Sequence, residues 1–264
     1  MLRKLTLLFS GLSLILVVIM AGCGGNGGDT AGTAETPEAA ADQPAPPVAE
    51  GTASVTGVIS YQGQVPTFQP LNMNADPACA AKHTEPAYPE VLALGEGNTM
   101  GNVFVQVKSG LPEGQWPAPS EAVVLDQEGC RYEPHVLGVM VGQTLQILNS
   151  DELLHNIHAL PEKNREFNRG MPPSMTETTH VFTQAEDMFH IKCDVHPWMS
   201  AYTVVMRHPY FAVTETDGQY SISGLPAGTY EIEAGHERLG TQTASVTVAD
   251  GESQSADFTF SAPQ

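Results

Sequence analysis

The stretch Cys193-Asp-Val-His-Pro-Trp-Met199 carries most of the information in this chain. It places a thiol, an imidazole and a thioether in one short loop, at Cys-x2-His-x2-Met spacing. These are soft to borderline metal donors, and with one more distant His they match the trigonal His2Cys set with a weak axial Met that holds electron-transfer copper. The stretch therefore predicts a copper centre completed by a His from elsewhere in the chain.

Short β-rich runs with turn residues between them recur through the rest of the chain, and no long helical periodicity is present. About 210 residues follow the N-terminal region, which is enough for two domains. Regular strand–turn spacing of this kind favours antiparallel β-sandwiches, so we predict an all-β fold. The runs are 54–61, 102–108, 142–149, 202–206, 229–234 and 244–249.

The segment 121–206 resembles the cupredoxins, the amicyanin- and plastocyanin-like blue copper domains. Residues 132–149 look like the family's opening strands, with a turn at Val141-Gly142 and an Asn-x-Asp before a His. Residues 178–193 look like the strand pair that leads into the ligand loop, and the loop spacing is similar to that of amicyanin. The resemblance implies a Greek-key β-sandwich with one type 1 copper that cycles between Cu(I) and Cu(II).

Carried over residue by residue, the resemblance implies the ligands His155, Cys193, His196 and Met199. His155 is preferred to His158 because Asn156 follows it, as is common in the family, and because residues three apart on a strand point to opposite faces. His158 is then expected to be a surface or packing residue. Asn156 is expected to bridge the two ligand loops by hydrogen bonds. The alternative is a buried Cys193 with no metal.

The resemblance also implies an exposed ligand at His196. Pro197 and Trp198 follow it, and the corresponding region of the resembling proteins docks partners, so both are candidate docking residues. An ordinary buried Trp is the alternative. The other His residues show no short spacing that would bring three together, and no nucleophile elbow or H-E-x-x-H motif is present. We therefore expect an electron carrier and not an enzyme.

Residues 213–230 resemble the carboxypeptidase regulatory-like (transthyretin-related) β-sandwich, in which turns such as Asp217-Gly218 and 226–228 flank a short strand. That family begins with a strand like 55–63, which here lies far upstream. We therefore predict that a cupredoxin domain at 113–206 is inserted into one discontinuous sandwich, formed by 52–112 and 207–264. The alternative is three segments in series.

The N-terminus is typical of an export signal. Arg3 and Lys4 precede an apolar run over 5–20, which is short for a membrane-spanning helix. Residues 19–23 resemble a bacterial lipobox, which implies a signal peptide at 1–22 and a lipidated Cys23. Gly24 in place of Asp implies the outer membrane in a double-membraned bacterium. We expect a membrane-anchored lipoprotein on the extracytoplasmic side, either periplasmic or at the cell surface. A plain secretory signal and an uncleaved anchor are the alternatives.

Residues 23–51 are rich in Gly, Ala, Thr, Glu and Pro, which predicts a flexible linker. The formal net charge is −19, from 11 basic and 30 acidic residues. Loss of Arg3 and Lys4 with the signal leaves 9 basic residues and a charge of −21. Such acidity argues against binding nucleic acid or anionic lipid. The acidity favours a basic redox protein as partner. The alternative is that it only keeps the protein soluble.

The chain has four Cys residues. If Cys23 is lipidated and Cys193 binds metal, Cys79 and Cys130 remain as a disulfide pair in an oxidising compartment. We therefore expect a type 1 copper protein that shuttles single electrons between redox partners. The alternatives are a copper-capture or surface interaction protein without a redox circuit, and a structural module that has lost its metal.

Overall fold

The computed structural model describes residues 47–262. The predicted signal peptide, Cys23 and most of the linker lie outside the described residues. Within them almost all regular structure is β-strand, so the all-β prediction is confirmed. No helix in this range is long and apolar enough to cross a membrane.

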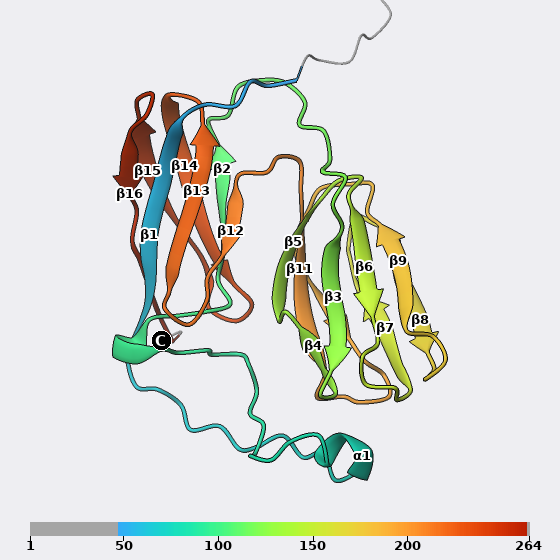
Figure 1. Cartoon of the computed structure of the whole chain (residues 1–264). Coiled ribbons are helices and arrows are strands. Elements are labelled where there is room, and N and C mark those ends of the chain that lie inside the picture. Colours follow the sequence, from blue (N-terminus) through green and yellow to red (C-terminus); the bar gives the residue numbers. More distant parts are fainter. Residues whose placement is uncertain (1–46, 263–264) are drawn as a thin grey trace, which may run out of the picture. The chain divides into compact units, whose positions relative to one another are not determined.

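The first sandwich is built from strands at the two ends of the described chain (Figure 1). One of its sheets has the order β13-β1-β16, with β17 also paired to β1, and the other has the order β12-β2-β14-β15. Side chains alternate between buried and exposed along β13, which is the period-two pattern of a strand with one face in a core. The strands are β1 (Ala53–Gln62), β2 (Phe104–Ser109), β12 (Phe211–Val213), β13 (Gln219–Leu225), β14 (Gly228–His236), β15 (Gly240–Val248), β16 (Ser253–Ser255) and β17 (Phe258–Ser261).

The second sandwich is built from the chain between β2 and β12. Its sheets have the orders β5-β11-β10-β7-β8 and β4-β3-β6-β9. A separate hydrophobic core lies between them, with Tyr132, Leu125 and Phe182 among its fully buried side chains. The strands are β3 (Val123–Glu128), β4 (Arg131–Glu133), β5 (Val136–Met140), β6 (Thr144–Leu148), β7 (His155–Ala159), β8 (Phe167–Met171), β9 (Glu177–Val181), β10 (Glu186–Lys192) and β11 (Ser200–Met206).

The strand pairing shows that the first sandwich is formed by two segments that lie far apart in the sequence. β1 pairs with β13, β16 and β17, and β2 pairs with β12 and β14, so segments about a hundred or more residues apart share both sheets of the first sandwich. The strands of the second sandwich all come from the chain between them. The predicted boundaries near 112 and 206 stay a prediction.

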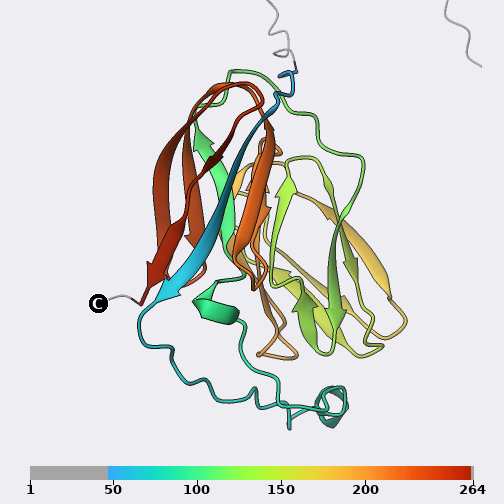
Figure 2. The same ribbon diagram turned by 60° about the vertical axis from the view of Figure 1, so that its left-hand side comes forward.

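The two sandwiches contact each other through a small apolar cluster. The stacked rings of Phe104 on β2 and Phe211 on β12 meet Gly138 on β5. A Cβ at position 138 would lie 2.3 Å from a ring carbon of Phe211, so only glycine allows this approach. Figure 1 shows β12 on the side of the first sandwich that faces β5, and Figure 2 shows the two sandwiches from another direction.

The connection between β1 and β2 is long and mostly irregular. It contains the short helix α1 (Pro77–Ala80) and a 3-10 turn, η1 (Glu96–Asn98). Cys79 on α1 forms a disulfide with Cys130, which lies in the turn between β3 and β4. The disulfide therefore joins the β1–β2 connection to the second sandwich.

Candidate metal centre

Two neighbouring strands of the second sandwich bring the predicted ligands together. Cys193 directly follows the last residue of β10, and His155 is the first residue of β7, which pairs with β10 in antiparallel fashion. The last residue of β10 and the first residue of β7 therefore lie at the same end of the sheet. The loop 193–199 then returns to β11, and it is closed by hydrogen bonds from Cys193 N to Met199 O (3.3 Å) and from Met199 N to His196 O (2.9 Å).

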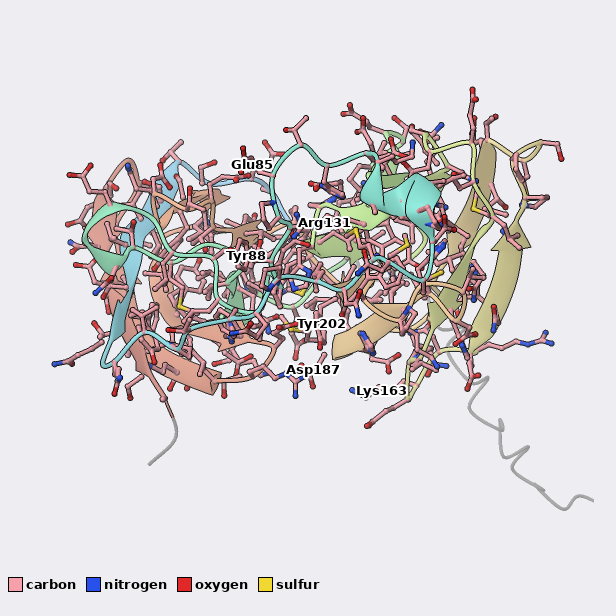
Figure 3. All side chains as sticks on the ribbon, turned by 90° about the horizontal axis from the view of Figure 1, so that it is seen from below. Glu85, Tyr88, Arg131, Lys163, Asp187 and Tyr202 are labelled. Carbon is pink, nitrogen blue, oxygen red and sulfur yellow. A yellow bond between two sulfur atoms is a disulfide. The ribbon has the colours of Figure 1, made fainter. Side chains whose placement is uncertain are left out.

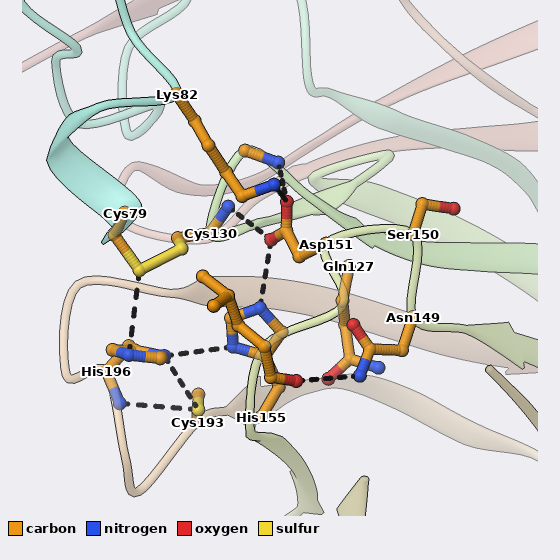
Figure 4. A network of polar contacts seen from close by, with 12 residues as sticks. Cys79, Lys82, Gln127, Cys130, Asn149, Ser150, Asp151, His155, Cys193 and His196 are labelled. Carbon is orange, nitrogen blue, oxygen red and sulfur yellow. Dashed lines mark hydrogen bonds and ion pairs between the residues drawn. A yellow bond between two sulfur atoms is a disulfide. The ribbon is translucent and has the colours of Figure 1, made fainter. Parts of the chain in front are cut away.

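The donor atoms of His155, Cys193 and His196 all lie within 4.8 Å of one another. The two imidazole Nδ1 atoms are 2.9 Å apart, and Cys193 Sγ is 4.0 Å from His196 Nδ1 (Figure 4). All three side chains are buried, with His155 at 0% and the other two at 2% exposure. A single ion between them can therefore reach all three donors away from bulk water.

Asp151 holds the outer edge of the His155 ring. Its Oδ2 lies 2.9 Å from His155 Nε2, and it also accepts hydrogen bonds from the backbone N–H groups of Gly129 and Cys130. Lys82 contacts its other oxygen at 2.9 Å. Burial raises the pKa of Asp151, but the bonds from His155, Lys82 and the backbone outweigh burial and lower that pKa to about 2. The carboxylate is therefore ionised at neutral pH.

His196 is enclosed, and the expectation that it is exposed is wrong. Its Nε2 lies 3.1 Å from Asp76 Oδ2 and 3.6 Å from Cys79 Sγ, both on the β1–β2 connection. The hydrogen bond from His196 is the largest cause of the lowered pKa of Asp76. On another side the ring centroid of Trp198 lies 5.1 Å from that of His196. The resemblance could not reveal this cover, because the cover comes from outside the resembling segment.

The hydrogen bonds of the two His rings leave the lone pairs of both Nδ1 atoms directed at each other, with Cys193 Sγ beside them. A carboxylate only accepts, so the Nε2 of each imidazole carries the hydrogen and each Nδ1 has a free lone pair. Two such lone pairs 2.9 Å apart, next to a sulfur, repel each other unless a proton or a metal ion lies between them. Burial lowers the pKa of His155, but its bonds to Asp151 and Cys193 outweigh burial and raise that pKa. The site thus attracts positive charge, and its nitrogen and sulfur donors fit copper.

The surroundings of Cys193 favour its ionised form, the thiolate. Burial raises the pKa of Cys193, but a hydrogen bond from the His155 ring when that ring is protonated, together with the backbone N–H groups of Asn156 and His196, outweighs burial and lowers that pKa. The bond from His196 N to Sγ is 3.3 Å. The thiolate is the form that binds metal. Among the described residues Cys193 is the free cysteine.

Asn156 joins the strand that carries His155 to the loop that carries Cys193. Its Oδ1 accepts from Asp194 N (2.7 Å) and Val195 N (3.3 Å) and lies 3.3 Å from Cys193 Sγ. Its Nδ2 donates to Asp194 Oδ2 at 3.2 Å. These bonds hold the two ligand segments at a set separation.

The remaining predicted residues lie close by. Met199 is 1% exposed and belongs to the same core as Cys193, while its role as axial ligand stays a prediction. Trp198 is partly buried and donates from Nε1 to Cys130 O at 3.1 Å, whereas Pro197 is exposed. Their role in partner docking also stays a prediction.

His158 lies outside this donor set, but it is more than a surface residue. Its Nδ1 is 2.8 Å from Asp194 Oδ2 and its Nε2 is 3.0 Å from Glu166 Oε1. Lys192 also contacts Asp194, at 2.8 Å. Hydrogen bonding to Lys192 is the largest cause that holds the pKa of Asp194 well below its usual range. Sequence reasoning missed this network, because charged residues on neighbouring loops carry no spacing signal.

Two further groups of potential ligands overlap the centre. They are Asp76 with Cys79 and His196, and Cys130 with Asp151 and His155. Each shares one imidazole with the first group and contains a cysteine of the disulfide, whose sulfur is not a thiolate. Both groups therefore mark the surroundings of a single centre.

Residues 199–261 match the family model of the carboxypeptidase regulatory-like domain. The match includes β11, which pairs with β5 and β10 in the second sandwich, as well as β12 to β17 of the first. None of the curated proteins matches the chain.

Several solved structures are similar to part of the chain. An amicyanin variant in its Cu(I) form is 24% identical over 39% of this chain and 98% of its own, with a TM-score of 0.30. A copper-containing nitrite reductase from Thermus scotoductus is 18% identical over 37% of this chain and 25% of its own, with a TM-score of 0.31. A purple cupredoxin from Nitrosopumilus maritimus is 22% identical over 31% of this chain and 98% of its own, with a TM-score of 0.27.

Proposed function

We propose that this chain is a type 1 copper protein that carries single electrons. The observation that supports the proposal most directly is the convergence of His155 Nδ1, His196 Nδ1 and Cys193 Sγ in one buried site. Met199, from the same loop, would supply the weak axial donor. Copper held there would alternate between Cu(I) and Cu(II) and so pass one electron per cycle.

The protein around these donors supports a carrier with little reorganisation. Asp151 fixes the ring of His155, and Asn156 ties the loop of Cys193 to β7. A ligand set whose positions are held by hydrogen bonds changes little when the charge of the metal changes. We propose that the chain does no bond chemistry of its own.

We further propose that the carrier is a lipoprotein, anchored through Cys23 on the extracytoplasmic side of a membrane. The lipobox-like segment 19–23 and the export signal before it support this part of the proposal. The net charge, −19 for the whole sequence and −21 without the signal peptide, supports a basic redox protein as electron partner, because opposite charges steer the two proteins together.

The test is to add one equivalent of Cu(II) to the purified full-length protein and to record its visible and EPR spectra. We expect an intense thiolate-to-copper band and a copper hyperfine pattern that is narrow or rhombic. Cys193→Ser should abolish the band because no copper–thiolate bond can form. A weak tetragonal copper signal, with the thiol of Cys193 still titratable, would refute the proposal.

One observation favours a second candidate, which is copper capture without a redox circuit. His196 is 2% exposed beneath Asp76 and Cys79, so a partner cannot touch this ligand directly. A capture protein should give up copper to a strong chelator and should exchange electrons slowly with small redox mediators. A carrier should show rapid, reversible electron exchange and should keep its metal.

A further inference from the structure

The segment Leu71–Ala87 of the β1–β2 connection forms a cap over the candidate metal centre. Its two ends are joined by a hydrogen bond from Leu71 N to Ala87 O (2.8 Å). Met73, in its first half, is 5% exposed and belongs to the core of the second sandwich. The cap is therefore packed on that sandwich rather than placed freely over it.

One covalent and two polar connections anchor the cap around the centre. The disulfide joins Cys79 to Cys130, and His83 Nε2 lies 2.7 Å from the backbone oxygen of Gly129. Lys82 Nζ lies 2.9 Å from Asp151 Oδ1, on the carboxylate that holds His155. The cap thus contacts the second sandwich at residues 129–130 and at Asp151, and Figure 4 shows Cys79 and Lys82 beside the two His rings.

Asp76 is the cap residue that reaches a predicted ligand. Its Oδ1 accepts from Ala78 N at 2.9 Å as the N-cap of α1, which leaves Oδ2 directed at His196 Nε2, 3.1 Å away. One carboxylate therefore does two things at once: it starts the helix and it accepts the ring hydrogen. In an amide, one of the two oxygens is replaced by an NH2 group, so an Asn whose Oδ1 caps Ala78 N would turn a donor toward His196 Nε2 instead of an acceptor.

We propose that Asp76 is a positioning residue for His196, delivered by the cap, and that the Cys79–Cys130 disulfide keeps it in place. By holding the Nε2 hydrogen, Asp76 keeps the lone pair of Nδ1 turned toward Cys193 and His155. This inference concerns the same site as the proposed function and rests on it for the effect on copper. The placement of the ring itself is independent of metal.

The first test uses the metal-free protein. In ¹⁵N-labelled protein, NMR of the imidazole rings gives the tautomer of His196 and the rate at which its Nε2 hydrogen exchanges with water. We expect the Nε2–H tautomer and slow exchange. Asp76→Asn, which is as good an N-cap as Asp, and Asp76→Ala should each accelerate exchange at least tenfold.

Two comparisons separate positioning from general loosening of the cap. Glu85 lies on the same segment and is exposed (Figure 3), so Glu85→Gln removes one charge from the cap and should leave the exchange rate unchanged. Reduction of the disulfide in the wild-type chain should accelerate exchange as Asp76→Ala does. If Asp76→Ala lowers stability too far, Asp76→Asn and the reduced wild type still decide the matter.

The second test uses the copper-loaded protein. The carboxylate raises the basicity of the imidazole and so favours Cu(II). Asp76→Asn should therefore raise the reduction potential, and Glu85→Gln should not. Unchanged ring exchange and unchanged potential in Asp76→Asn would overturn the inference. Absence of a type 1 spectrum, with a protected ring in the metal-free protein, would overturn the proposed function and leave the role of Asp76 standing.

Discussion

Reducing the disulfide between Cys79 and Cys130 should lower the free energy of unfolding of the protein by several kcal/mol. The two residues are 51 positions apart, so the bond closes a long loop in the unfolded chain. The chain-entropy model assigns a loop of this length about 4 kcal/mol at 25 °C. For a folded protein of this size, that corresponds to a fall in melting temperature of roughly 8–16 °C. The cap also loses its covalent anchor, which acts in the same direction.

The assay is urea unfolding of the metal-free protein, oxidised and reduced, so that the two states compared have the same sequence. Two Trp residues are present, so both states carry Trp116→Phe, which leaves Trp198 as the fluorescent reporter beside the centre. Cys79→Ala/Cys130→Ala should unfold at the same urea concentration as the reduced protein. A difference below about 1 kcal/mol between the oxidised and reduced proteins would refute the argument from loop closure.

Three further outcomes follow from the geometry. Met199→Leu conserves volume at a buried site, so it should lower the free energy of unfolding by less than about 1.5 kcal/mol. Copper should stay bound, and voltammetry should show a higher reduction potential because the axial donor is lost. Gly138→Ala should destabilise the protein by about 1–3 kcal/mol in urea unfolding, because a Cβ there would lie 2.3 Å from the ring of Phe211; wild-type stability would contradict this. The pKa of Glu186 is raised by burial but lowered more by hydrogen bonds from Asn164 and the neighbouring backbone, so it is lowered overall. A lowered folded pKa means that its stabilising effect is present above the unfolded pKa and is lost as pH falls through the folded one. Glu186→Gln should therefore flatten the acid side of the stability–pH curve, and an unchanged curve would count against it.

Much of the fold could be predicted because strand patterns are local. The predicted runs 54–61, 142–149 and 229–234 overlap β1, β6 and β14. The predicted strand pair 178–193 likewise covers β9 and β10. β8 was not predicted, because only one of its five residues is buried and it has little pattern of its own. Its pairing depends on its neighbours and not on its own composition.

The sequence by itself determined the kinds of donor in the candidate centre and the spacing of Cys193, His196 and Met199, since these lie in one loop. Only the tertiary structure decided what surrounds them. Asp76 meets His196 from 120 residues away, and no local pattern encodes such a pair. The burial of His196 depends in the same way on a connection that belongs to the other sandwich. Contacts between distant segments are decided by how the whole chain packs, and for this reason the cover of the centre became visible only in the folded molecule.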